Sequence, residues 1–130
     1  MKKSLPFLPA LASLTLMSCT MTGAAPEVSA TQSYGVGCVP VINAVAAAAG
    51  DMPIPDADFR GVNYRFANRA STELTLYARS NGTPRETWSA WTCVENSGKV
   101  TLNVKTSGLS ATSANKLHAQ FFSALNLPRP

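Results

Sequence analysis

The chain has 130 residues, of which 14% are charged, and this size fits one compact domain of ordinary small size. Eleven Lys and Arg against seven Asp and Glu give a formal net charge of +4. Loss of Lys2 and Lys3 with an N-terminal leader would leave nine against seven, or +2. So small an excess does not by itself indicate a nucleic-acid or other polyanionic partner.

The first eighteen residues are arranged like a secretory leader. Lys2 and Lys3 precede an apolar run from Leu5 to Met17, and a small residue follows that run. The run is thirteen residues long, whereas a helix that spans a bilayer needs about 20 apolar residues. We therefore predict that residues 1–18 are a signal peptide that is removed from the mature protein.

The stretch Leu16-Met17-Ser18-Cys19 resembles the lipobox of bacterial lipoproteins, in which the cysteine is lipidated and becomes the mature first residue. The resemblance implies that Cys19 carries two or three acyl chains, which anchor a protein stably to a membrane. Thr20 stands where an aspartate would retain an enteric lipoprotein in the inner membrane, so the outer membrane is favoured. The alternative is an ordinary leader that is cut after Ala24, Ala25 or Ala30 and releases a secreted or periplasmic protein.

Two further cysteines, Cys38 and Cys93, are 55 residues apart. An even pair in an exported protein favours a disulfide over a metal site or a catalytic thiol. Closing a loop of this length stabilises the folded state by roughly 4 kcal/mol in the chain-entropy model. We therefore predict a Cys38–Cys93 disulfide.

Composition divides the mature chain into a tether and one domain. Residues 19–33 comprise the lipidated cysteine and a small, polar, flexible tether, and residues 34–130 form a single small α+β domain. Within this domain, the alanine-rich residues 41–49 predict a short helix. Pro53 and Pro55 then favour an extended crossing into the first strand.

Four segments alternate with the period of a half-buried strand. The positions that we assign to one face are Val62, Tyr64 and Phe66; Leu74, Leu76 and Ala78; Trp88, Ala90, Thr92 and Val94; and Val100, Leu102 and Val104. The short connections that contain Gly82 and Gly98 suit tight hairpins. The pattern therefore predicts a four-stranded antiparallel meander.

The C-terminal segment changes to the period of a helix, with apolar residues at Ala114, Leu117, Phe121 and Leu125. Its start can be capped by Ser110, Thr112 or Ser113. We expect this helix to cover the face that contains Phe66, Leu76, Trp88 and Leu102. By the same parity Cys93 lies on the opposite face, so its bond to Cys38 should bring the N-terminal helix over that second face. The sheet should then be covered on both sides.

Five residues share the second face and form a candidate ligand-binding set: Arg65, Tyr77, Arg79, Trp91 and Lys105. Aromatic rings flanked by cations could stack on sugar rings, or hold an anionic glycan or single-stranded nucleic acid. The alternative is that the N-terminal segment buries Tyr77 and Trp91 while the charged tips reach solvent.

The sequence contains no recognisable catalytic or cofactor site. His118 is the only histidine, has no cysteine or paired acid at ligand spacing, and is expected to be structural. Asp51, Asp56 and Asp58 lack the glycine and the terminal glutamate of a calcium loop, so we expect them to be solvated loop acids. We therefore expect no enzyme activity, no cofactor and no metal.

These features predict a lipid-anchored cell-envelope protein that acts as a non-enzymatic binding or accessory module. Its partners would be the membrane, through the lipid, and an envelope protein or glycan, and we expect no nucleic acid. The alternative is a secreted or envelope inhibitor of a hydrolase such as lysozyme or a protease. A third hypothesis is a small hydrolase that uses Asp56, Asp58 or Glu86 as acid or base.

Overall fold

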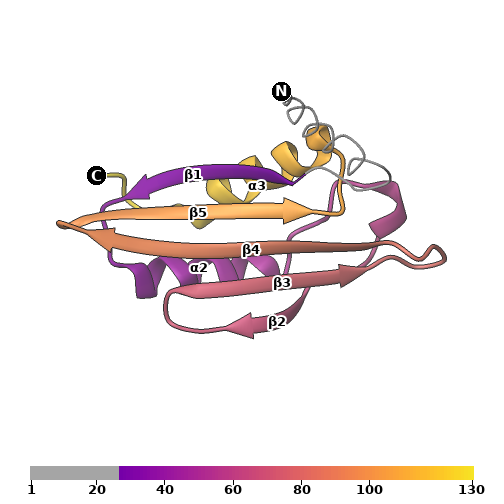
Figure 1. The fold of residues 1–130 in the computed structure, drawn as a ribbon, viewed down its shortest axis with the longest axis horizontal. Helices are drawn as coiled ribbons and strands as arrows, with labels where there is room; N and C mark the ends of the chain where they lie inside the picture. The colour runs from indigo at the N-terminus through magenta and orange to yellow at the C-terminus, as the bar shows by residue number, and fades with distance from the viewer. Residues whose placement is uncertain (1–26) are drawn as a thin grey trace, which may run out of the picture.

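The computed structural model describes residues 27–130, so the predicted leader and Cys19 lie outside the described residues. Its elements are β1 (Val28–Tyr34), α2 (Cys38–Ala49), the single-turn η1 (Ala57–Phe59), β2 (Arg65–Arg69), β3 (Glu73–Arg79), β4 (Glu86–Asn96), β5 (Lys99–Ser107) and α3 (Ala111–Leu125) (Figure 1). The predicted α+β class, with an antiparallel sheet and a C-terminal helix, is confirmed.

The sheet has five strands rather than the predicted four, in the spatial order β1-β5-β4-β3-β2. Strands β2 to β5 form the predicted meander, and β1 adds to its far edge by pairing antiparallel with β5, from Val28 opposite Thr106 to Tyr34 opposite Val100. Residues 28–33 therefore form part of the domain and not of the flexible tether. Their alternation is hard to see because the half-buried positions hold Ala30 and Gln32 instead of large apolar residues.

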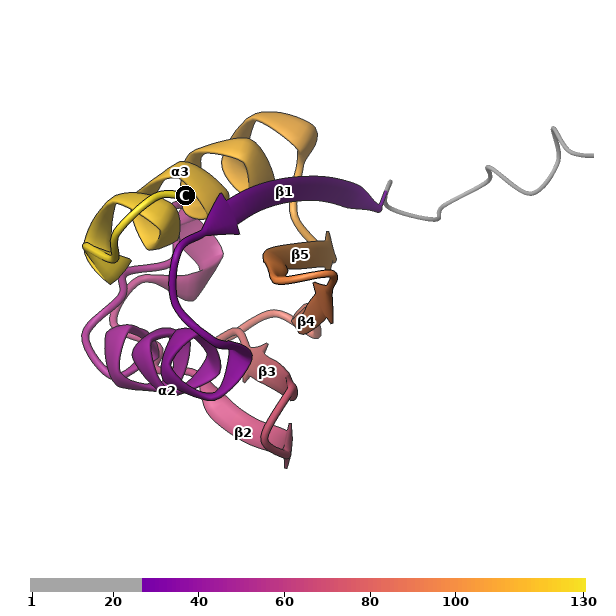
Figure 2. The same cartoon turned by 90° about the vertical axis from the view of Figure 1, so that its left-hand side faces the viewer.

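Both helices pack on the same face of the sheet (Figure 2). Helix α2 contacts β3, β4 and β5, and α3 contacts β1, β5 and α2. The prediction that the sheet is covered on both sides is therefore wrong. Phe66, which we expected beneath the C-terminal helix, lies on the edge strand β2 and is 48% exposed.

The wrong prediction of coverage on both faces arises from the phase of β4, that is, from which of its alternating side chains point toward the core. Trp91 points into the core and is 0% exposed, whereas Trp88 points away from the helices and is 42% exposed. The inward side of β4 also carries Thr87 and Ser89, which are both buried. Because two of its inward residues are polar and three of its outward residues, Trp88, Ala90 and Val94, are apolar, the alternation in β4 indicates the wrong face.

The predicted disulfide between Cys38 and Cys93 is present, with 5.6 Å between the two Cα atoms. Cys38 is the first residue of α2, and Cys93 points inward from β4. The bond therefore fixes the start of α2 on the inner face of the sheet. There α2 buries Val41, Ile42 and Val45 in the core.

Helix α3 forms as its pattern predicts, and its buried residues are Ala114, Leu117, His118, Phe121 and Leu125. Ser110 is the N-cap, because its side chain accepts a hydrogen bond of 3.1 Å from the backbone N–H of Ser113. The helix is followed by Asn126 in the left-handed conformation, with φ of 51°. In the part of the chain that the structure describes, no helix is both long enough and apolar enough to cross a membrane.

Candidate functional site

The face of the sheet that the helices leave open is mostly small and polar. Alternation along the strands turns hydroxyl and amide side chains to this face, which we call the outer face: Ser29, Thr31, Thr75, Thr92, Thr101, Asn103 and Ser107. Thr31 and Asn103 are register partners and are joined by a hydrogen bond of 2.8 Å. Such a surface offers many hydrogen-bonding groups and little aliphatic area.

One aromatic pair interrupts this polar surface. Tyr77 of β3 and Trp88 of β4 are register partners, and their ring centroids are 4.5 Å apart with an angle of 52° between the planes. The Tyr77 hydroxyl donates a hydrogen bond of 2.8 Å to Oε2 of Glu86. This bond raises the pKa of Tyr77 above its ordinary value of 10.0, because ionising the phenol would remove the donor and set two anions side by side. The phenol ring is therefore held in a fixed position against the indole.

Three cations surround the pair. Arg65 of β2 is the register partner of Tyr77, and Lys105 of β5 lies opposite Ala90, two positions beyond Trp88. Arg79 follows Tyr77 along β3. We call these five residues, Arg65, Tyr77, Arg79, Trp88 and Lys105, the outer platform.

The acidic residue nearest to the platform is already engaged. Oε2 of Glu86 accepts the hydrogen bond from Tyr77 and lies 3.7 Å from Nη1 of Arg79. Within residues 27–130, neither Arg65 nor Lys105 forms an ion pair. The platform therefore presents an exposed aromatic surface between two cations that have no acidic partner among these residues.

Four of the five predicted ligand-binding residues thus share the outer face, but Trp91 does not. Trp91 lies in the core with its ring centroid 4.9 Å from that of Phe121 and 5.8 Å from that of Phe122. Trp88, which we did not include, takes the place on the outer face. The disulfide could have indicated this, because the core side of β4 must contain Cys93 and therefore also Trp91.

His118 lies in the interior between α3 and the sheet and is 2% exposed. Its Nε2 is 2.7 Å from Oγ1 of Thr106, which in turn is 2.8 Å from Oγ of Ser89. Burial lowers the pKa of His118 from its ordinary value of 6.5, so the ring is neutral at neutral pH. Among the described residues no group of three or more His, Cys, Asp or Glu side chains could hold a metal ion. Through Nε2 the histidine therefore provides a hydrogen-bond partner for one buried hydroxyl of the sheet, that of Thr106.

Asp56 and Asp58, which were candidate acids for hydrolysis, are bound by Arg85. The guanidinium lies 3.0 Å from Oδ2 of Asp56 and 2.8 Å from Oδ2 of Asp58, and donates a hydrogen bond of 2.8 Å to the carbonyl of Gly108. It also lies over the ring of Phe59, 5.3 Å from the centroid. These contacts raise the pKa of Arg85, first through Asp58 and then through Asp56. The cluster fastens the η1 segment to the start of β4 and to the loop before α3.

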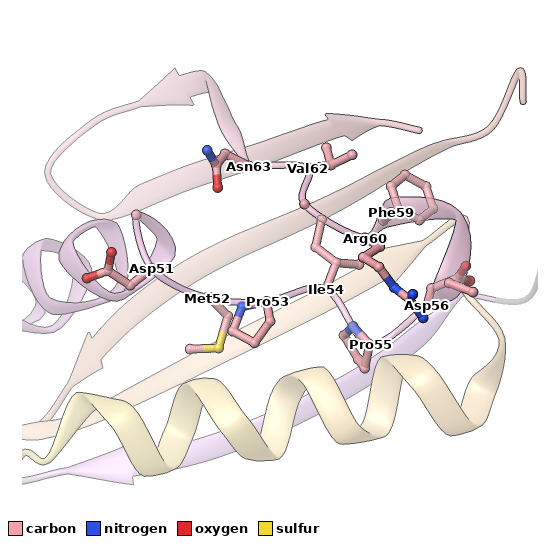
Figure 3. A pocket seen from close by; sticks show the side chains of 13 residues that line it. Asp51, Met52, Pro53, Ile54, Pro55, Asp56, Phe59, Arg60, Val62 and Asn63 are labelled. Carbon is pink, nitrogen blue, oxygen red and sulfur yellow. The ribbon is translucent and has the colours of Figure 1, made fainter. Parts of the chain in front are cut away.

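The segment between α2 and β2 forms an open hollow of about 670 Å³, lined only by residues 50–63 (Figure 3). Figure 3 shows Asp51 at one end of the hollow and Asp56 at the other, with Pro53 and Ile54 between them. Asp51 therefore lies apart from Asp56, whereas Asp56 and Asp58 are brought together by the guanidinium of Arg85.

Neither a protein-family model nor a curated protein matches the sequence. The fold is similar to that of protein CV1439 from Chromobacterium violaceum, with a TM-score of 0.56, 13% identity, and coverage of 76% of this chain and 93% of that chain. It is also similar to DynU16, a protein of the dynemicin biosynthetic locus, with a TM-score of 0.54 and 16% identity. That match covers 76% of this chain but only 45% of DynU16. At these identities the likeness shows the fold alone.

Proposed function

We propose that this chain is a non-enzymatic binding module that is held at the cell envelope by a lipid on Cys19, with the outer face of its sheet as the binding surface. One observation carries the proposal: both helices lie on the inner face, and the outer face presents Trp88 with 42% of its surface exposed. Large aromatic side chains that remain exposed beside cations are typical of recognition surfaces.

Two observations support export and anchoring. The disulfide between Cys38 and Cys93 is of a kind that persists in oxidising compartments. The lipobox-like stretch that ends at Cys19 supplies the attachment point. Because β1 begins at Val28, the nine residue steps from Cys19 span at most about 30 Å. The binding partner would therefore lie at the membrane surface or in material attached to it.

The roles of the acidic residues support a binding function over hydrolysis. Asp56 and Asp58 neutralise Arg85, and Glu86 accepts the hydrogen bond from Tyr77. Each of these carboxylates therefore has a structural partner, which would have to be displaced before the carboxylate could act on a substrate.

The anchor is tested by the intact mass of the protein isolated from its native envelope. A chain that starts at Cys19 and carries added acyl mass is expected, and reduction should add two hydrogen masses when the disulfide opens. A chain without acyl mass that starts at a later residue would refute the anchoring.

The binding surface is tested by incubating the detergent-solubilised mature protein with envelope fragments and measuring the fraction that sediments with them. We expect Trp88→Ala to lower this fraction and Val94→Ala to leave it unchanged. Val94 is the matched control, because it is 52% exposed on the same face but lies about 20 Å from Trp88 along β4. Equal retention of the wild type and Trp88→Ala would refute the outer face as the binding surface.

A further inference from the structure

We propose that the ligand of the outer platform is a carboxylate-bearing polysaccharide chain, a proposal that rests on the function proposed above. A sugar ring would stack on Trp88, and its carboxylates would pair with Arg65 and Lys105. Three properties of the outer face carry this inference: its exposed aromatic pair, its hydroxyl-rich surroundings and the positions of its cations.

The aromatic pair offers an exposed indole as a stacking surface on the outer face, near the turn between β3 and β4. The hydrogen bond from Tyr77 to Glu86 fixes the phenol, and the phenol in turn supports the indole at a centroid distance of 4.5 Å. The indole is therefore held in place before a ligand arrives, which lowers the entropy lost on binding. Ala90 and Thr75, the register partners two positions further along, are small and leave the side of the indole accessible.

The surroundings of the pair match a sugar better than an apolar protein surface. Protein–protein interfaces have cores enriched in aromatic residues and Met, with apolar neighbours that exclude water. Here the nearest uncharged neighbours on the adjoining strands carry hydroxyls: Ser107 is the register partner of Trp88, and Thr75 is two positions before Tyr77 on β3. Thr92 and Asn103 continue this polar surface further along the face. Sugar hydroxyls can exchange hydrogen bonds with such groups, directly or through water.

The charges favour an acidic ligand and set its length. Arg65 on β2 and Lys105 on β5 are separated by three strand spacings, which is about 14 Å across the sheet. The aromatic pair lies between them, so a ligand that reaches both cations must be longer than one sugar ring. Because Glu86 is already bound by Tyr77 and Arg79, these two cations keep their charge available. A chain with carboxylates on successive rings would satisfy both.

Binding can be measured with polygalacturonate as the acidic probe and dextran as the neutral one. Of the two tryptophans, only Trp88 is exposed, so protection of its fluorescence from acrylamide quenching reports occupancy of the platform. We expect polygalacturonate to protect Trp88 and dextran to bind at least tenfold more weakly. Sedimentation of the same complexes provides a second readout that does not depend on the indole.

Four variants, one of them a control, separate the parts of the proposal. By sedimentation, Trp88→Ala should weaken polygalacturonate binding at least tenfold, whereas Trp88→Phe should retain most of it because a ring is still present. The double variant Arg65→Gln with Lys105→Gln should weaken binding at low salt and reduce its salt dependence. Val94→Ala should bind like the wild type.

Four outcomes would overturn the inference. Equal binding of dextran would remove the acidic requirement, and unchanged binding by Trp88→Ala would remove the platform. Tighter binding of oligothymidylate than of polygalacturonate would replace the glycan with a single-stranded nucleic acid. Retention on envelope fragments that depends on Trp88 without any polygalacturonate binding would overturn the ligand class, while the proposed function would still hold.

Discussion

The phase of β4 can be tested by truncating its two tryptophans one at a time. They are three positions apart on one strand, yet Trp91 is 0% exposed and Trp88 is 42% exposed. Trp91 packs against Phe121 and Phe122 at centroid distances of 4.9 and 5.8 Å, so Trp91→Ala would leave a large cavity beneath α3. Truncation of a buried tryptophan costs about 3–5 kcal/mol. This is a large part of the roughly 5–15 kcal/mol that stabilises a small domain.

Trp88→Ala should have a much smaller effect on stability. The indole is already partly hydrated, and its main contact is with Tyr77, a pair of the kind that contributes about 0.5–1.5 kcal/mol beyond the burial of area. We expect a loss of about 1 kcal/mol in the free energy of unfolding.

Urea unfolding, followed by far-UV circular dichroism with the disulfide intact, measures both losses. Circular dichroism is preferable to fluorescence because each variant removes one of the two tryptophans. Trp91→Phe keeps a ring in the core and should lie between the wild type and Trp91→Ala. It also provides a measurement if the alanine variant does not fold. Equal losses for Trp88→Ala and Trp91→Ala, or a larger loss for Trp88→Ala, would refute the inward assignment of Trp91.

Three other properties of the fold can be checked by unfolding experiments. Replacing Cys38 and Cys93 together by alanine should lower the free energy of unfolding by roughly 4 kcal/mol, because the 55-residue separation no longer restricts the unfolded chain. A loss below about 1 kcal/mol in urea would contradict that account. Because burial lowers the pKa of His118 in the folded state, the unfolded state binds more protons at mildly acidic pH. Stability should therefore be constant well above pH 6.5 and should fall as the pH is lowered through 6.5, and His118→Gln should flatten this part of the pH profile. Gly108→Ala should lower the midpoint of thermal unfolding more than Gly98→Ala. Both glycines have positive φ, of 91° and 78°, but only at position 108 would the new Cβ overlap a backbone carbonyl oxygen, that of Glu86. Equal shifts for the two variants would show that the contact relaxes without cost.

The parts of the fold that depend on local periodicity could be predicted from the sequence. Helix α3 has its predicted apolar face, and Ser110 is one of the three predicted caps. The positions of β3, β4 and β5 also follow from their alternation and from Gly82 and Gly98 in the turns, whereas β2 begins at Arg65, later than the predicted first strand. These elements could be predicted because each one combines a clear apolar period with a distinct start or stop.

The phase of β4 could not be predicted from alternation because its core side is half polar. Ser89 is buried because Thr106 is within hydrogen-bond distance, and Thr106 is in turn paired with His118 from a helix that lies far along the chain. A hydropathy pattern contains no information about such a tertiary partner. The same error placed Trp91, which lies in the core, in the candidate binding set, and it left Trp88 out of that set.

Strand β4 is held near both of its ends by contacts of different kinds. Arg85, which immediately precedes it, is fastened to Asp56 and Asp58, and Cys93 near its other end is bonded to Cys38. As the middle strand of five it is also paired on both edges. Its amide protons should therefore be among the slowest of the protein to exchange with solvent deuterium, since exchange would require global opening. Reduction of the disulfide would release only one end, so exchange should then accelerate around residues 92–96 before it does around residues 87–89.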